Sequence, residues 1–132
     1  MQYIIMLTIV VGLAAADFVT GFIKAYAAGD INSRKMRTGG LGKAAEIVVM
    51  GSAIGLNIGF EQLGRYYNSP ELTELAGMVT ALGVFIYIAM MEIISILENF
   101  AELSPDAGWL RGLITRLKIR SKQSAKQNNG AK

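Results

Sequence analysis

The sequence contains no cysteine and no histidine, and only two of its 132 residues are proline. The first two absences exclude thiol catalysis, disulfides, Cys/His zinc sites and imidazole acid–base chemistry. Both prolines lie outside the long apolar runs, so these runs favour uninterrupted helices. The sequence also lacks a phosphate-binding loop and a nucleophile–base pair. We therefore expect no enzyme activity and no catalytic, cofactor or metal site.

Charge is scarce in three long apolar stretches, each of which contains one acid. The stretches are Gln2–Ile23 with Asp17, Ala44–Phe60 with Glu46, and Leu75–Leu97 with Glu92. About 20 apolar residues in a helix span the roughly 30 Å core of a bilayer. The pattern predicts an all-α membrane protein with three transmembrane helices. An acid at mid-depth costs about 2.5–3.5 kcal/mol, so each acid is a candidate functional residue.

The predicted organisation is one membrane domain followed by two short segments. Residues 1–103 form a three-span transmembrane domain, with spans at about 2–27, 44–63 and 75–101. Residues 104–120 form a C-terminal amphipathic interfacial helix, and the polar basic tail 121–132 is expected to be disordered.

The first apolar run could also be read as a cleaved signal peptide, because Ala14-Ala15-Ala16 resembles a cleavage site. However, the N-terminus lacks a basic region, and the apolar pattern resumes after Asp17. A retained transmembrane helix is favoured.

The connections between the spans carry turn and cap signals. Ser33 is the predicted N-cap of a short basic helix, Arg34–Arg37, and the glycine-rich stretch 38–42 is predicted to be a flexible connector. The sequence Asn68-Ser69-Pro70-Glu71 indicates a turn or a helix start.

Basic residues gather in the first loop and the C-terminal segment, which predicts the orientation. Short cytoplasmic loops are enriched in Lys and Arg. We therefore expect a multi-pass membrane protein with the N-terminus outside and the C-terminus in the cytoplasm. The predicted membrane-surface basic residues are Arg34, Lys35, Arg37, Arg111, Arg116, Lys118 and Arg120.

Apolar and basic residues alternate in the segment 107–120 and place an apolar face beside basic residues. This pattern is typical of a helix that lies on an anionic membrane surface. Nucleic acid is the competing partner for a basic tail and is less favoured, so the predicted partner is the lipid bilayer and not nucleic acid.

Two overlapping GxxxG steps, Gly51, Gly55 and Gly59, lie within the second apolar run. Residues four apart share a helix face, so the glycines form a shallow groove that a second helix can approach closely. Packing within one chain and homo-oligomerisation are equally compatible with this motif.

Two polar stripes at helical spacing follow the acids of the first and third runs. They consist of Asp17, Thr20 and Lys24, and of Glu92, Ser95 and Asn99. The stripes could line a pore between several chains. Alternatively, Asp17 pairs with a basic group such as Lys24, and Glu92 is hydrated near the cytoplasmic surface. Glu46, three residues after Lys43, is expected at the inner surface.

The segments Asp17–Ala25, Ser33–Arg37 and Gly40–Lys43 resemble the first half of the toxin-secretion/phage-lysis holin family, also called phage holin family 4. The segment Tyr87–Asn99 followed by Pro105 resembles its second half. The resemblance implies a phage or prophage protein that oligomerises in the inner (cytoplasmic) membrane of its bacterial host. Its lesions or pores would release an endolysin or a toxin as cargo and permit host lysis.

Two other functions remain open from the residues alone. A small ion-channel or transporter subunit could use Asp17 and Glu92 as coupling acids. A scaffold within a larger membrane complex could use the glycine groove alone.

Overall fold

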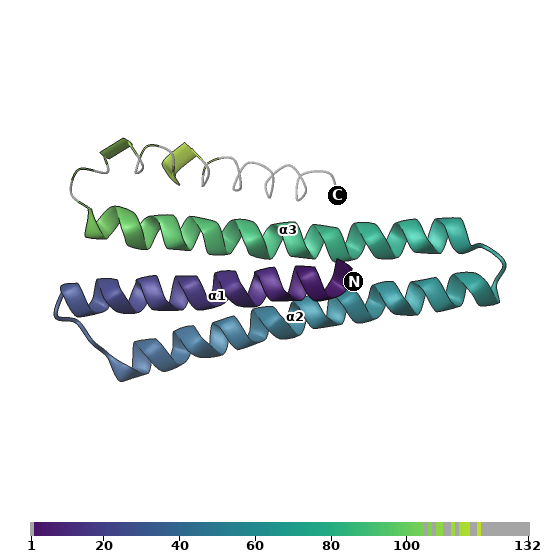
Figure 1. Ribbon diagram of the computed structural model, residues 1–132, viewed down its shortest axis with the longest axis horizontal. Coiled ribbons are helices and arrows are strands. Elements are labelled where there is room, and N and C mark those ends of the chain that lie inside the picture. Colours follow the sequence, from purple (N-terminus) through teal and green to yellow (C-terminus); the bar gives the residue numbers. More distant parts are fainter. Residues whose placement is uncertain are drawn as a thin grey trace, which may run out of the picture.

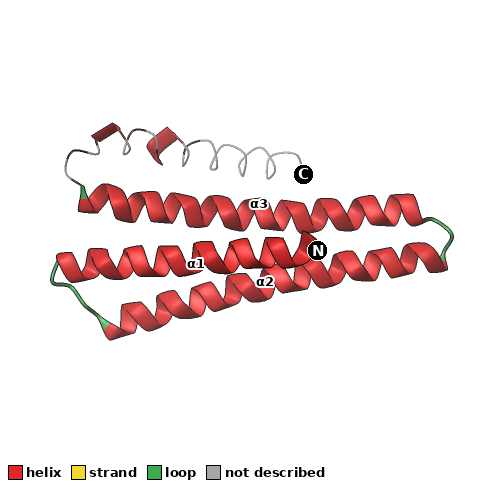
Figure 2. Cartoon of the chain, in the orientation of Figure 1, coloured by secondary structure: helices red, strands yellow, loops and turns green. Residues whose placement is uncertain are grey.

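The computed structural model describes residues 2–104 together with residues 106, 108–109, 112, 114–116 and 119. In this part of the chain all regular secondary structure is helical (Figure 2). The three long helices are α1 (Gln2–Ala27), α2 (Ser33–Tyr66) and α3 (Pro70–Leu103). They pack as a three-helix bundle in which every helix contacts the other two, and each helix runs antiparallel to the one before it (Figure 1).

Each of the three helices is long and apolar enough to cross a membrane. At 1.5 Å per residue, the 26 residues of α1 extend about 39 Å and the 34 residues of α2 and of α3 about 51 Å. All three exceed the roughly 30 Å bilayer core. The prediction of an all-α protein with three transmembrane helices is confirmed.

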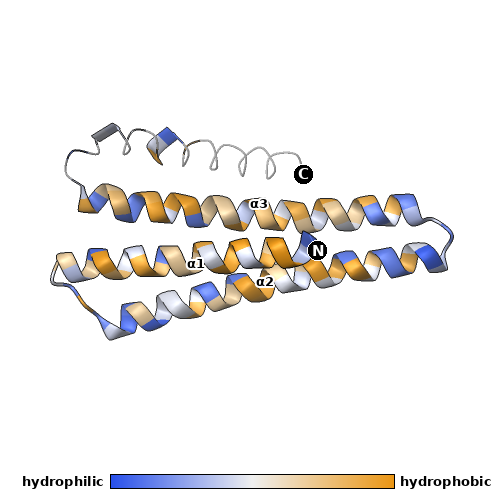
Figure 3. Ribbon diagram, in the orientation of Figure 1, coloured by the Kyte–Doolittle hydropathy of each residue, from blue (hydrophilic) through white to orange (hydrophobic). Residues whose placement is uncertain are grey.

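Apolar residues predominate along the middle of each helix, and polar residues gather toward the ends of α2 and the start of α3 (Figure 3). Large apolar side chains such as Ile4, Val48 and Val79 are more than half exposed. A water-soluble protein rarely exposes so much contiguous apolar surface. These side chains are therefore expected to face lipid.

The first loop reverses the chain between α1 and α2 with a left-handed glycine. Gly29 has φ +67°, and the backbone N–H of Asp30 donates to the carbonyl of Ala25 at 3.0 Å. The N-cap of α2 is Asn32, whose Oδ1 accepts from the backbone N–H groups of Arg34 and Lys35. The predicted cap at Ser33 is wrong, because Asn32 satisfies these free amides and Ser33 is already helical.

The glycine-rich stretch 38–42 is helical, so the predicted flexible connector is also wrong. The basic segment and the second apolar run form one continuous helix, α2. Glycine is less favourable than alanine in a helix interior by about 1 kcal/mol, and packing on neighbouring helices can outweigh this. Here Gly40 lies beside Phe18 of α1, whose ring would be 3.8 Å from an added Cβ.

The second loop is short, and α3 begins at its proline. Pro70 occupies the first turn of the helix, where its missing N–H is not needed. Asn68 supplies the reversal with φ 51°, a left-handed conformation that asparagine tolerates better than most residues. The stretch Asn68–Glu71 thus contains both a turn and a helix start.

A small apolar core joins the three helices near the middle of the bundle. Val10 of α1, Met50 of α2 and Ile88 of α3 are almost completely buried and pack together. This cluster therefore contains one buried residue from each of the three helices.

Two glycines permit α2 and α3 to approach closely. A Cβ added at Gly77 would clash with the Asn57 side chain and would lie 3.0 Å from the Asn57 Cα atom. A Cβ added at Gly64 would clash with the Thr73 hydroxyl and lie 3.0 Å from the Pro70 Cα atom. Close packing through small residues is typical of membrane helices.

Residues 108–109, 112, 114–116 and 119 have helical backbone, and Ile114 is buried against Ala101 and Leu97 of α3. Trp109 is largely exposed. Part of the predicted amphipathic helix, including Arg111, Lys118 and Arg120, and the whole tail 121–132 lie outside the described residues.

Adding one methyl group at Gly77 should destabilise the bundle, because the Asn57 backbone blocks the space. Gly77→Ala is expected to lower the free energy of unfolding by about 1–3 kcal/mol. The matched control is Gly83→Ala on the same helix, where none of the described residues lies within 4 Å of the added Cβ. This control should be neutral or slightly stabilising. Thermal unfolding in detergent micelles measures both, and equal midpoints would contradict the assigned α2–α3 contact.

Candidate functional site

The ammonium group of Lys43 on α2 lies among the three acids of the apolar runs. Its Nζ atom is 2.8 Å from Asp17 Oδ2 on α1 and 2.7 Å from Glu92 Oε2 on α3. Glu46 Oε2, one turn further along α2, is 3.7 Å away. One lysine therefore connects all three helices, and we call Asp17, Lys43, Glu46 and Glu92 the polar cluster.

Three members of the polar cluster are shielded from solvent, whereas the Glu46 side chain is 34% exposed. The Glu92 side chain has 0% exposure, that of Asp17 10% and that of Lys43 21%. Ionised groups away from water are stable only when they are paired. The short contacts to Lys43 provide this pairing for Asp17 and Glu92, so the three helices depend on one another electrostatically.

The two predicted polar stripes face each other within one chain. Asn99 of α3 donates to Asp17 Oδ1 at 3.0 Å and to the Thr20 hydroxyl at 3.3 Å. Further along, Lys24 Nζ is 2.9 Å from Glu102 Oε1. These contacts form a ladder of polar pairs between α1 and α3.

The structure changes the expected pairing of the acids. Asp17 pairs with Lys43 rather than with Lys24, which pairs with Glu102. Glu92 is buried instead of hydrated. Glu46 joins the polar cluster through its 3.7 Å contact with Lys43, and its side chain stays 34% exposed, which is compatible with the expected surface position. The spacing of residues in the sequence shows which of them share a helix face. It does not show which other helix packs against that face.

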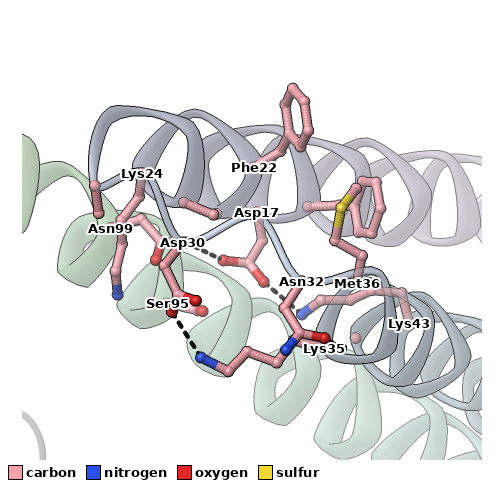
Figure 4. Close-up of a pocket in the computed structure, with 15 residues that line it drawn as sticks. Asp17, Phe22, Lys24, Asp30, Asn32, Lys35, Met36, Lys43, Ser95 and Asn99 are labelled. Carbon is pink, nitrogen blue, oxygen red and sulfur yellow. Dashed lines mark hydrogen bonds and ion pairs between the residues drawn. The ribbon is translucent and has the colours of Figure 1, made fainter.

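A cavity of about 410 Å³ lies beside the polar cluster, between the end of α1, the first loop, the start of α2 and α3. Asp17 and Lys43 reach it from one side, and Asn99 and Ser95 from another (Figure 4). Its wall also contains apolar side chains such as Phe22. The cavity gives the polar cluster a partly polar passage toward the first loop.

The glycine groove faces away from the bundle. Gly51, Gly55 and Gly59 are all exposed, and no atom of the described residues lies within 4 Å of a Cβ added at any of them. Packing within the described part of the chain is therefore not the role of this groove. The glycines in the internal contact, Gly64 and Gly77, were not singled out from the sequence. The small-residue spacing Thr73, Gly77 and Ala81 is the signal that could have identified this face.

A second polar contact also escaped the sequence analysis. Asn57 on α2 is buried, and its side-chain amide donates to the Tyr3 hydroxyl on α1 at 3.1 Å. A single amide inside an apolar run was the available signal, because such a group needs a partner in lipid.

The predicted surface-basic residues that the structure describes are exposed. Arg34, Lys35 and Arg37 lie in the first turns of α2, and Arg116 lies in the C-terminal segment. Lys35 Nζ pairs with Asp30 Oδ2 at 2.7 Å. The first loop and the end of α3 lie at the same end of the bundle (Figure 1).

The polar cluster is suited to holding charge and not to covalent chemistry. Lys43 lies between the acids, and no group of three or more metal-ligating side chains forms within the described residues. No site for a cofactor is assigned.

Removing the central ammonium group should strongly destabilise the bundle. Lys43→Met leaves Asp17 and Glu92 without their cation and is expected to lower the free energy of unfolding by about 3–5 kcal/mol. The control Lys35→Met breaks an exposed pair and should have little effect. Combining Lys43→Met with Asp17→Asn and Glu92→Gln should restore part of the loss. Thermal unfolding in micelles measures all three proteins, and equal effects of the two lysine variants would contradict the assignment.

Comparisons with known proteins support one family. Residues 2–118 match the bacteriophage holin family, so the match covers all three helices and part of the C-terminal segment. No curated protein and no solved structure matches the chain. The chain therefore belongs to the bacteriophage holin family, which consists of membrane proteins and not of enzymes.

Proposed function

We propose that this holin assembles in the cytoplasmic membrane of a bacterial host into lesions through which an endolysin, or a toxin, leaves the cytoplasm. The observation that carries the proposal is the family match over three membrane-length helices. The released endolysin would then reach the cell wall and lyse the host. The cargo would pass through the lesion without forming a stable complex with the chain.

The glycine groove on α2 is the proposed contact between copies. It is exposed on a helix whose neighbouring side chains Val48 and Leu56 are also exposed. A second copy could bring its own α2 close to this groove and gain van der Waals contacts that lipid chains do not provide as well. Small residues favour helix contact in a bilayer, where no hydrophobic effect drives it.

The ladder between α1 and α3 suggests how one chain could serve two states. Within a single bundle, Asp17 and Asn99 satisfy each other and avoid lipid. In an assembly of many copies, the same groups could separate and face a water-filled lesion, because water would replace their hydrogen bonds. The proposed change exchanges internal partners for water without placing acids in lipid.

The proposed orientation places the N-terminus outside and the first loop and C-terminus in the cytoplasm. The basic residues of the first loop and the C-terminal segment support it. The end of α3 lies beside the first loop, so both basic segments can meet the same membrane surface.

Lysis should depend on an endolysin supplied with the holin. Inducible expression in bacteria together with a cytoplasmic endolysin should produce an abrupt fall in culture turbidity, whereas the endolysin alone should not. Holin without endolysin should stop growth without clearing the culture. Steady growth in every case would instead favour an ion-channel or transporter subunit or a membrane scaffold.

Filling the glycine groove should weaken assembly. Gly55→Leu is expected to reduce cross-linked oligomers and to delay lysis, because leucine prevents close approach of a second α2. Gly83→Leu is the matched control, since Gly83 is also exposed with no atom within 4 Å of an added Cβ. Unchanged oligomer size and lysis time in Gly55→Leu would refute the role of the groove.

The absence of cysteine makes the orientation directly measurable. Ser69→Cys in the second loop should react with a membrane-impermeant maleimide added to intact cells before lysis. Ser33→Cys at the start of α2 should react only after permeabilisation. Both serines are exposed, so burial does not distinguish them. The reverse labelling pattern would invert the proposed topology.

A further inference from the structure

Two carboxylate oxygens in the polar cluster have no hydrogen-bond donor among the described residues. Glu92 is 1% exposed, and only its Oε2 atom contacts Lys43, while Oε1 is buried without a partner. Glu46 Oε2 is likewise buried, with no hydrogen-bond partner. A buried acceptor without a donor costs about 1–3 kcal/mol, and more when the group is charged. This arrangement calls for a donor that the other described side chains do not supply.

The two carboxyl groups are close enough to supply that donor to each other. Glu46 Oε2 on α2 and Glu92 Oε2 on α3 lie 3.7 Å and 2.7 Å from the same Lys43 Nζ atom, and each carboxyl group has one buried oxygen without a hydrogen-bond partner among the described residues. Two ionised carboxylates at this separation repel each other, but one added proton turns the repulsion into a hydrogen bond. We propose that Glu46 and Glu92 bind one proton between them, and that this shared proton fastens α2 to α3.

The charges around the pair support one bound proton. Fully ionised, the polar cluster contains three carboxylates and one ammonium, a net charge of −2; one bound proton reduces it to −1. The remaining carboxylate, Asp17 on α1, accepts from Asn99 on α3 and contacts Lys43. The other nearby lysine on α1, Lys24, contacts Glu102 instead. Lys43 is the one cation that contacts Glu46 or Glu92 among the described residues.

Solvent can exchange this proton through the cavity beside the polar cluster. Lys43 and Asp17 line the cavity, and Lys43 directly contacts Glu92. The cavity is bordered by the first loop, so the proton would exchange with the side of the membrane that this loop faces. On the proposed orientation that side is the cytoplasm.

The shared proton makes the closed bundle sensitive to pH in one direction. At low pH the proton is bound and α2 and α3 are linked. As pH rises the proton leaves, the two carboxylates repel, and the bundle loosens. A link to lesion opening rests on the proposed function, whereas the proton site itself does not.

Infrared spectroscopy of the purified protein in lipid nanodiscs tests the site directly. A protonated carboxyl group has a C=O stretching band that an ionised carboxylate lacks, and it shifts in heavy water. The wild type should show this band from a buried acid near neutral pH. Both Glu46→Gln and Glu92→Gln should lose it, while Glu74→Gln, an exposed acid on α3, should retain it. Absence of the band in the wild type would overturn the proposal, even if a variant failed to fold.

Stability as a function of pH provides an independent readout. The unfolding midpoint of the wild type should fall as pH rises through the loss of the shared proton. Glu46→Gln should remove most of this dependence, because its amide can donate to Glu92 as the proton does. Glu74→Gln should retain the dependence. The same pH dependence in Glu46→Gln and wild type would contradict the shared proton.

Neither measurement uses lysis, so the two proposals can fail separately. A chain that shows the carboxylic acid band but does not lyse cells would keep the proton site and lose the proposed function. A chain that lyses cells without the band would keep the function and lose the site.

Discussion

The contact of the Lys43 ammonium with acids from all three helices is the interaction on which the rest of the bundle depends. Apolar faces alone would not fix the arrangement, because lipid chains are as apolar as leucine. A buried charge, in contrast, has few acceptable positions. The contacts of Lys43 with Asp17 and Glu92 therefore set the rotation and the register of α1 and α3 relative to α2.

The inward and outward faces of the helices carry different kinds of residue. Polar groups and the close-packing glycines Gly64 and Gly77 face inward, whereas large apolar side chains and the groove of Gly51, Gly55 and Gly59 face outward. This division separates what holds one chain together from what could join several chains. A protein of the holin family has a use for both surfaces if it first disperses in lipid and later assembles.

Polar contacts inside a membrane bundle can be stable without being permanent. The hydrogen bond from Asn99 to Asp17 is favourable within one chain, yet water could replace it at a lesion. The unpartnered oxygens of Glu46 and Glu92 are a weaker point of the same network. The internal contacts keep the acids away from lipid. Water could still replace these contacts as the hydrogen-bond partner of each acid.

The sequence by itself determined the number and kind of helices, because long apolar runs and a helix-starting Pro70 are local features. It also revealed the family, since the holin resemblance depends on short motifs along the chain. The tertiary structure alone decided which groups meet. Lys43 and Glu92 are 49 residues apart, and their contact depends on how α2 and α3 are rotated against each other. That rotation results from packing between helices, which the pattern within any single helix does not specify.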